Sequence, residues 1–119
     1  MGGRGCPFLC TFCLWPSINY NRKFRSRTPD NICDEIEWLI EKYGMKEIYF
    51  DEGTFNVGTK RAIDISKKIV ERGIKITWSC NGRVDAVNKE MLYWMKKSGC
   101  KLICYGPESA NEETLRRVK

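Results

Sequence analysis

The 119-residue sequence predicts an α/β protein with about three parallel βα units, forming part of a (βα) barrel. Stretches with apolar residues at helical spacing alternate with short runs rich in β-branched and aromatic residues. A glycine follows each of three helical stretches, at Gly44, Gly73 and Gly99, which lie 29 and 26 positions apart. This spacing is typical of a repeated strand–helix unit, in which strands separated by helices lie parallel.

The first helical stretch has clear boundary signals. Thr28 suits the N-cap and Pro29 suits the first turn, where its missing N–H costs nothing. Gly44 suits the left-handed position that ends a helix, and a strand is predicted over residues 47–51. The later elements are expected as a helix over 59–72, a strand over 75–80, a helix over 88–98, a strand over 101–105 and a helix from Asn111.

The first 28 residues lack this periodicity and are predicted to form a long loop. Loops of this length in compact domains are usually functional. The loop includes a basic run over residues 22–27 with Phe24 inside it, a combination that suits a nucleic-acid backbone and one stacked base. Such a run is more often a solvated loop or a contact with a neighbouring domain, so nucleic acid is not the favoured partner.

The composition excludes several classes of protein. Lys and Arg number 21 against 15 Asp and Glu, and the net charge of +6 permits an anionic partner without requiring one. The chain has no histidine, which excludes Ser-His-Asp hydrolysis and histidine-based zinc sites within it. No apolar run approaches the roughly 18 residues of a membrane span, and the first residues lack the apolar core of a signal peptide. We therefore expect a cytoplasmic protein that does not cross a membrane.

Cysteine placement is the strongest chemical signal. Cys6, Cys10 and Cys13 have the spacing C-x3-C-x2-C, which lets three thiolates face one metal centre. Closed zinc sites and simple electron-transfer clusters use four protein ligands, so three leave one metal position open. Two alternatives are three inert thiols and a zinc site completed by another cysteine. The remaining cysteines are predicted to pack in the core, the last two on the same strand face as Leu102: Cys33, Cys80, Cys100 and Cys104.

Polar residues follow the carboxyl end of each predicted strand, where (βα) barrels place their functional groups. The set is Asp51, Glu52 and Thr54 after the first strand, Ser79, Asn81, Arg83 and Asp85 at the second, and Glu108, Ser109 and Asn111 after the third. The sequence therefore predicts a ligand site at this edge. The alternative is that these loops are polar because they are exposed, and that Asn111 only caps a helix.

The cysteine motif resembles the signature of the radical S-adenosylmethionine (radical SAM) superfamily, C-x3-C-x-aromatic-C, with Phe12 as the aromatic residue. Residues 4–8, 49–52 and 106–109 look like members fused to cobalamin-binding domains. The resemblance implies one radical SAM core domain over 1–119, truncated at both ends, with a cluster-binding loop over 1–28 and βα repeats over 29–119. Such domains usually have six βα units. The chain would therefore be the N-terminal half, with the strand before Cys6 missing or reduced to residues 1–3.

The resemblance also implies the chemistry. Cys6, Cys10 and Cys13 would bind three irons of a 4Fe–4S cluster, and SAM would chelate the fourth. An electron from a ferredoxin- or flavodoxin-type reductant would pass through the cluster and cleave SAM to a 5′-deoxyadenosyl radical, which acts on an unidentified substrate in an anaerobic context. Cobalamin would be held by a domain outside this chain. The alternatives are an iron–sulfur or zinc-binding module without SAM chemistry, and a catalytically inactive truncation.

Several SAM contacts follow from the same resemblance. The usual Gly-Gly-Glu motif is replaced by residues 50–52, so both carboxylates there are candidates for the methionine amino group. The implied contacts are Asp51 or Glu52 at that amino group, the backbone near Phe12 at the adenine edge, Arg83 at the methionine carboxylate, and Glu108 and Ser109 at the ribose hydroxyls or the carboxylate.

Three parallel strands would leave two open edges and an uncovered inner face. We expect this face to include Tyr49, Trp78 and Leu102. The isolated chain is therefore expected to self-associate, or to need a partner that supplies the remaining barrel strands or a neighbouring domain. SAM cleavage by the chain alone should be weak or absent.

Overall fold

Three parallel strands form the central sheet, in the order β3 (Glu47–Phe50), β4 (Thr77–Gly82) and β5 (Cys100–Tyr105). The computed structural model describes residues 1–14 and 22–118. Tyr49 pairs with Ser79, and Asn81 pairs with Cys104, so the three carboxyl ends lie at one edge. The predicted parallel α/β arrangement is confirmed, and the sheet stays open within the described part of the chain.

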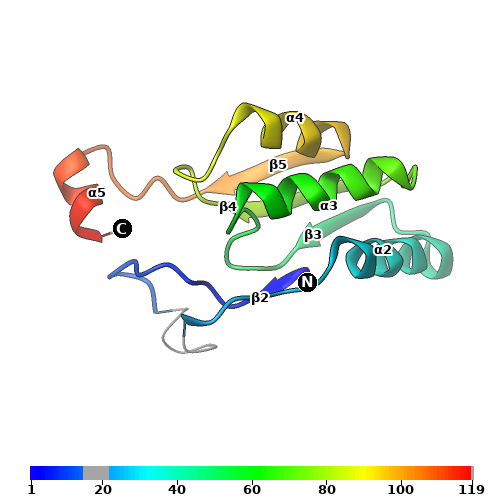
Figure 1. Ribbon diagram of the computed structural model, residues 1–119, viewed down its shortest axis with the longest axis horizontal. Coiled ribbons are helices and arrows are strands. Elements are labelled where there is room, and N and C mark those ends of the chain that lie inside the picture. The colour runs from blue at the N-terminus through cyan, green and yellow to red at the C-terminus, as the bar shows by residue number, and fades with distance from the viewer. Residues whose placement is uncertain (15–21, 119) are drawn as a thin grey trace.

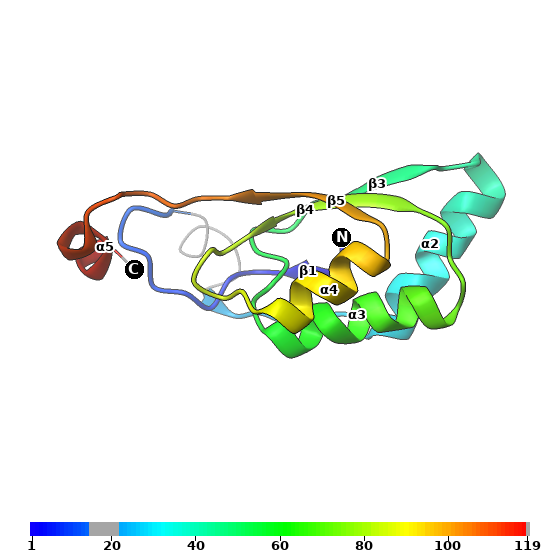
Figure 2. The same ribbon diagram turned by 90° about the horizontal axis from the view of Figure 1, so that it is seen from above.

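Three helices cover a single face of this sheet, as Figures 1 and 2 show: α2 (Pro29–Tyr43), α3 (Thr59–Glu71) and α4 (Lys89–Lys97). The side chain of Thr28 accepts a hydrogen bond from the Asn31 N–H and caps α2, which ends at left-handed Gly44. A fourth helix, α5 (Glu112–Val118), extends beyond the sheet. Among the described residues, no helix is long and apolar enough to span a bilayer.

The core lies between the sheet and the three helices. Trp78 is fully buried against Phe50 and Phe55, with ring centroids 5.3 and 5.0 Å away, and its indole N–H donates to the Ser98 carbonyl at 3.1 Å. The expectation that Trp78 lies on the uncovered face is therefore wrong, because its strand position points toward the helices. Tyr49 and Leu102 do lie on the uncovered face and are 49% and 57% exposed.

An irregularity in β5 changes which side chains share a face. Trp78 pairs with Cys100, but the next residue of β4, Ser79, pairs with Leu102, so the register shifts by one residue. Cys100 consequently packs against the core, whereas Cys104 is exposed. The predicted common face is therefore wrong for Cys100, whereas Leu102 and Cys104 do share a face. The core placement of Cys33 and Cys80 is confirmed.

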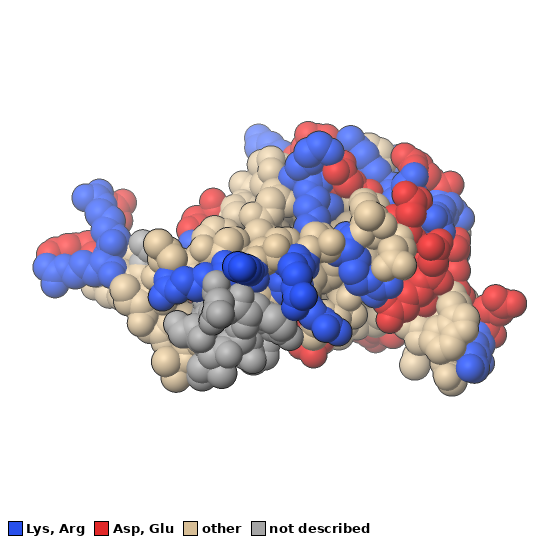
Figure 3. All heavy atoms as spheres, turned by 60° about the horizontal axis from the view of Figure 1, so that its bottom comes forward, with Lys and Arg blue, Asp and Glu red and all other residues tan. Residues whose placement is uncertain are grey.

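The N-terminal segment contains a short ladder that the sequence pattern did not predict. Strand β1 (Gly3–Arg4) pairs antiparallel with β2 (Arg25–Ser26) and lies outside the parallel sheet. The basic run over 22–27 therefore has a structural role: Phe24 packs beside Gly3, and Arg27 pairs with Glu35. Basic side chains gather in the middle of the face seen in Figure 3.

Gly99 has no room for a side chain. Its φ is +100°, and a Cβ atom there would overlap the Ile76 carbonyl oxygen of the neighbouring segment. We expect Gly99→Ala to lower the free energy of unfolding by about 2–5 kcal/mol, from the positive φ and the steric overlap together.

Gly44→Ala is the matched control for this measurement by urea denaturation. Gly44 has a φ of +64° and open space around it, so only the conformational cost of about 1–2 kcal/mol applies. Equal losses in the two variants would contradict the steric argument.

Candidate functional site

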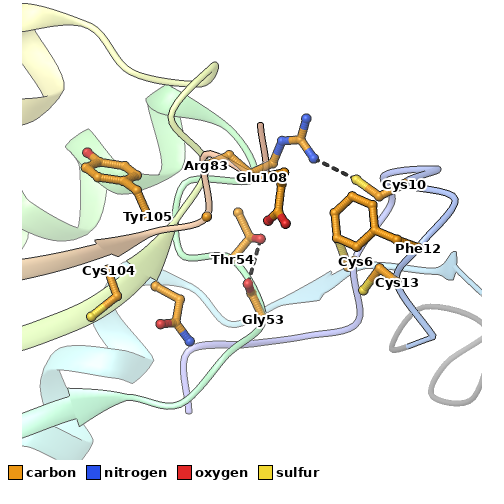
Figure 4. A pocket seen from close by; sticks show the side chains of 13 residues that line it. Cys6, Cys10, Phe12, Cys13, Gly53, Thr54, Arg83, Cys104, Tyr105 and Glu108 are labelled. Atoms are coloured by element: carbon orange, nitrogen blue, oxygen red, sulfur yellow. Dashed lines mark hydrogen bonds between the residues drawn. The ribbon is translucent and has the colours of Figure 1, made fainter. Parts of the chain in front are cut away.

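A cavity of about 360 Å³ lies at the carboxyl edge of the sheet (Figure 4). Its walls come from the N-terminal segment and from the segment after each of the three parallel strands. The lining residues are Cys6, Cys10, Phe12 and Cys13, then Gly53 and Thr54 after β3, Asn81, Gly82 and Arg83 at the end of β4, and Cys104, Tyr105, Gly106 and Glu108 at and after the end of β5. The predicted ligand site at this edge thus corresponds to a real cavity.

The cysteine loop is held at this edge from both sides. The ladder of β1 and β2 precedes and follows it in the chain, and the Arg27 N–H donates to the Gly2 carbonyl. At its far side the Thr11 N–H donates to the Val118 carbonyl of α5 at 3.0 Å. Within the loop the Cys13 N–H donates to the Cys10 carbonyl at 3.3 Å, which turns the second and third cysteines toward the same side.

The three thiols suit a cluster in their chemistry and their placement. Cys6, Cys10 and Cys13 are all unpaired and half-buried, and all three line the cavity. No set of three or more Cys, Asp or Glu side chains within residues 1–14 and 22–118 is arranged around a single metal ion. In a cluster each thiolate binds a different iron, so the sulfurs need only surround a common space. The donor set therefore fits a 4Fe–4S cluster with one iron left for another ligand.

Arg83 lies between the sheet edge and the cysteine loop. Its Nη1 donates to the Cys10 Sγ at 3.1 Å, and the guanidinium carbon lies 3.9 Å from the centre of the Phe8 ring. Its Nε and Nη2 donate to the Asp85 carboxylate at 2.9 and 2.5 Å. Burial lowers the pKa of Arg83, but the hydrogen bonds to Asp85 and Cys10 outweigh it and raise that pKa above its ordinary value. The side chain is therefore a permanent cation at the cavity wall.

Glu108 places a carboxylate at the cavity from the segment after β5. Its backbone has a φ of +68°, a conformation that is uncommon for a residue with a side chain. The carboxylate folds back over Gly106, where a Cβ atom would overlap it. Figure 4 shows the Arg83 side chain extending toward Cys10 and the Glu108 carboxylate pointing into the cavity beside Thr54. The cavity thus presents one anion and one cation beside the three thiols.

Three of the predicted SAM-contacting residues do not line the cavity. Asp51 is exposed, and Ser109 accepts a hydrogen bond from the Asn111 N–H in the turn before α5. Asn111 in turn caps α5 by accepting from the Thr114 N–H, so the capping alternative for Asn111 is confirmed. Phe12 does line the cavity and is half exposed. The roles of Asp51 and Ser109 toward SAM stay predictions.

Glu52, the third, is buried away from the cavity. The Arg61 side chain of α3 places its Nη2 3.2 and 3.0 Å from the Oε1 and Oε2 atoms of Glu52. The Glu52 side chain is 1% exposed and the Arg61 side chain 12%. Burial raises the pKa of Glu52 above its ordinary value, against the lowering influence of Arg61. Gly2 and Gly3 pack directly on this carboxylate, where a Cβ atom would crowd it. Here Glu52 holds the N-terminal segment against the sheet.

Two residues of this region were not singled out as site residues in the sequence. Cys104 is exposed and lines the cavity rather than packing in the core. Asn56 is buried in the loop after β3, and its side chain bonds the backbone of the loop that carries Arg83. Cys104 was expected to pack in the core, but it lies with Leu102 on the face that the helices leave uncovered. The role of Asn56 depends on a contact between residues 27 positions apart.

The fold and the site together define the class of protein: an open, parallel α/β sheet with a cavity at its carboxyl edge that three cysteines line. Residues 2–119 match the radical SAM superfamily, and the chain belongs to it. It is 38% identical over 118 residues to an uncharacterized methyltransferase of Pyrococcus horikoshii, covering 99% of this chain and 26% of that protein. It is 34% identical over 112 residues to the anaerobic magnesium-protoporphyrin IX monomethyl ester cyclase of Cereibacter sphaeroides, covering 90% and 18%.

Solved structures share the fold. The radical S-adenosylmethionine methyltransferase TsrM from Kitasatospora setae, with cobalamin and a [4Fe-4S] cluster bound, gives a TM-score of 0.87 at 19% identity, over 96% of this chain and 23% of that one. The cobalamin-dependent S-adenosylmethionine radical enzyme OxsB, with aqua-cobalamin and S-adenosylmethionine bound, gives 0.80 at 24% identity, over 98% and 19%. The chain thus spans about a quarter or less of the length of these proteins.

The buried Glu52–Arg61 pair supports a stability prediction. Arg61→Met leaves the Glu52 carboxylate buried without its cation, so we expect a loss of about 3–5 kcal/mol in the free energy of unfolding at neutral pH. Because the folded-state pKa of Glu52 is raised, protonation relieves the penalty, and the loss should shrink as the pH falls through that pKa.

Arg72→Met is the control for urea unfolding at several pH values. Arg72 pairs with Asp30, Asp34 and Glu37, which are largely exposed, so its loss should be much smaller. Adding Glu52→Gln to Arg61→Met should recover part of the stability. An Arg61→Met defect that does not change with pH would contradict the assignment.

Proposed function

We propose that this chain is the cluster- and SAM-binding part of a radical SAM enzyme. The observation that carries the proposal is the shared cavity: the three motif cysteines and the segments after all three parallel strands meet in one space. A 4Fe–4S cluster bound there would supply the electron that cleaves SAM to methionine and a 5′-deoxyadenosyl radical. The residues at the edge of the cavity would then orient SAM beside the open iron of the cluster.

The residues of the chain divide this work among them. Cys6, Cys10 and Cys13 would bind three irons of the cluster through their thiolates and leave the fourth iron open for SAM. The Glu108 carboxylate accepts hydrogen bonds and suits the ribose hydroxyls of SAM, and Phe12 offers an aromatic wall beside them. The three strands are bonded in register, which fixes the end of β5, from which the segment with Glu108 continues, relative to the ends of β3 and β4.

The relatives support an assignment to the cobalamin-using branch. TsrM and OxsB, which share the fold, are described with cobalamin bound, and other relatives include a bacteriochlorophyllide d C-12(1)-methyltransferase of Chlorobaculum tepidum. We infer that the whole protein acts with cobalamin and a low-potential reductant, and that methyl transfer is its reaction class. Further chain or a partner would cover the open edge of β5, beside which an apolar groove lies.

The cluster ligands are tested first. After anaerobic reconstitution with iron and sulfide, we expect the wild-type chain to hold four irons and four sulfides and to be brown. Cys6→Ala, Cys10→Ala and Cys13→Ala should each lose the cluster, because no other thiol is expected to replace the missing ligand. Iron and sulfide analysis with absorption spectroscopy makes the measurement.

Cys104→Ala is a close control, since Cys104 lines the same cavity but lies outside the motif. It should retain the full cluster. If Cys104→Ala lost iron while a motif variant kept it, the ligand assignment would be wrong. One zinc per chain in place of iron would favour the alternative of a zinc-binding module.

SAM binding is tested with the cluster intact. Glu108→Gln should weaken SAM by about 1–3 kcal/mol, because the amide oxygen is a weaker acceptor for the ribose hydroxyls than the carboxylate. Equilibrium dialysis with labelled SAM gives the affinity. Glu112→Gln on α5, whose side chain is exposed and pairs with Arg116, is the control and should bind SAM as the parent does. Equal affinities in all three proteins would exclude Glu108 from the site.

A further inference from the structure

We propose that Arg83 is a positioning residue for the iron–sulfur cluster, held in place by Asn56, and that it sets the position and reduction potential of the cluster through Cys10. This inference rests on the proposed function, since it concerns the cluster that the three cysteines would hold. It differs from the expectation that Arg83 neutralises the methionine carboxylate of SAM. The contacts of the guanidinium are the reason for the difference.

The guanidinium of Arg83 is occupied on its face and on its edges. Phe8 lies under its face with the ring centre 3.9 Å from the guanidinium carbon. One edge donates to the Cys10 sulfur at 3.1 Å, and the other binds the Asp85 carboxylate. Phe8 and Cys10 belong to the cysteine loop, so a single side chain from the β4 edge contacts this loop at two points. The Arg83 side chain is only 14% exposed.

Asn56 fixes the backbone from which this side chain extends. Its Oδ1 accepts from the Arg83 N–H at 2.8 Å, and its Nδ2 donates to the carbonyls of Arg83 and Ala86 at 2.9 and 2.7 Å. Both ends of the amide are used, so neither a carboxylate nor an apolar side chain can make the same set of bonds. Asn56 is buried, so water cannot satisfy these backbone groups if the Asn56 side chain is replaced.

A cation that donates to a ligating sulfur changes the energetics of the cluster. Reduction adds negative charge to the cluster and its thiolates, and a nearby positive donor stabilises the reduced form more than the oxidised form. Arg83 should therefore raise the reduction potential and ease electron uptake. Residues that orient a ligand in this way commonly change metal affinity by about 10–100-fold when replaced.

The test compares reconstituted wild-type chain with Arg83→Met, Arg83→Lys and Asn56→Asp, using Arg116→Met on the exposed α5 as control. In redox titrations followed by electron paramagnetic resonance, we expect a more negative midpoint potential in Arg83→Met. Arg83→Lys, which keeps the charge without the fork geometry, should fall between Arg83→Met and wild type. Asn56→Asp should shift in the same direction, because its carboxylate faces the Arg83 and Ala86 carbonyls. Iron loss to a chelator should be roughly 10–100-fold faster in Arg83→Met.

Unchanged potential and unchanged iron loss in both Arg83 variants would overturn the proposal. A second arm uses the cluster-free protein, where hydrogen exchange over residues 6–14 should be faster in Arg83→Met than in wild type. Equal exchange there would also count against the Arg83 contacts. If the wild-type chain takes up no iron, the proposed function fails, and the exchange arm still tests whether Arg83 holds the loop.

Discussion

The common direction of the three strands is the constraint on which the rest of the molecule depends. Parallel strands bonded in register end at one edge, so the segments that follow β3, β4 and β5 all emerge there. Residues far apart in the sequence, such as Thr54, Arg83 and Glu108, thereby line one cavity. The helices make this possible by returning the chain across a single face. The buried Trp78, packed between Phe50, Phe55 and Ser98, fixes the sheet against that helix layer.

The second requirement is to bring the cysteine loop to this edge, and a buried ion pair does so. Glu52 leaves the end of β3 and turns inward, where it meets Arg61 of α3 and packs on Gly2 and Gly3. Arg61 also donates to the Phe55 carbonyl and to Ser26 of the ladder. Because Glu52 is buried in this way, Asp51 is the carboxylate of residues 50–52 that stays exposed.

The sequence predicted the helices well because their signals are local. Thr28, Gly44, Gly73 and Gly99 act within one turn of the element they bound, and the last three have the positive φ expected of them. The ladder of β1 and β2 has two residues in each strand, too few to show any periodicity. Periodicity also failed for one residue of β5, because the register shift turns Cys100 toward the core, whereas Leu102 and Cys104 keep a common face.

The site was predictable to the extent that topology fixed it. Strand-end position located Arg83 and Glu108 at the cavity, and the spacing of the motif located its three cysteines there. What a strand-end residue contacts depends on the opposite side of the cavity, which sequence spacing does not describe. The contact of Arg83 with Cys10 could therefore not be predicted from the sequence. Nothing in the sequence distinguished Asn56 from the other polar residues of its loop.

The position of Arg83 has a consequence for how the cavity distributes charge. A cluster with three thiolate ligands carries net negative charge. Among the described residues that line the cavity, Glu108 is the only one with a carboxylate. Arg83 extends toward Cys10, and the Glu108 carboxylate points into the cavity, so under the proposed function the cation would offset the thiolates and leave the anion for another ligand. SAM carries a sulfonium and an ammonium group against one carboxylate, so under the proposed function the Glu108 carboxylate would favour its entry. A cation directed at the SAM carboxylate would lose this division, because the same guanidinium cannot keep its bonds to Cys10 and Asp85.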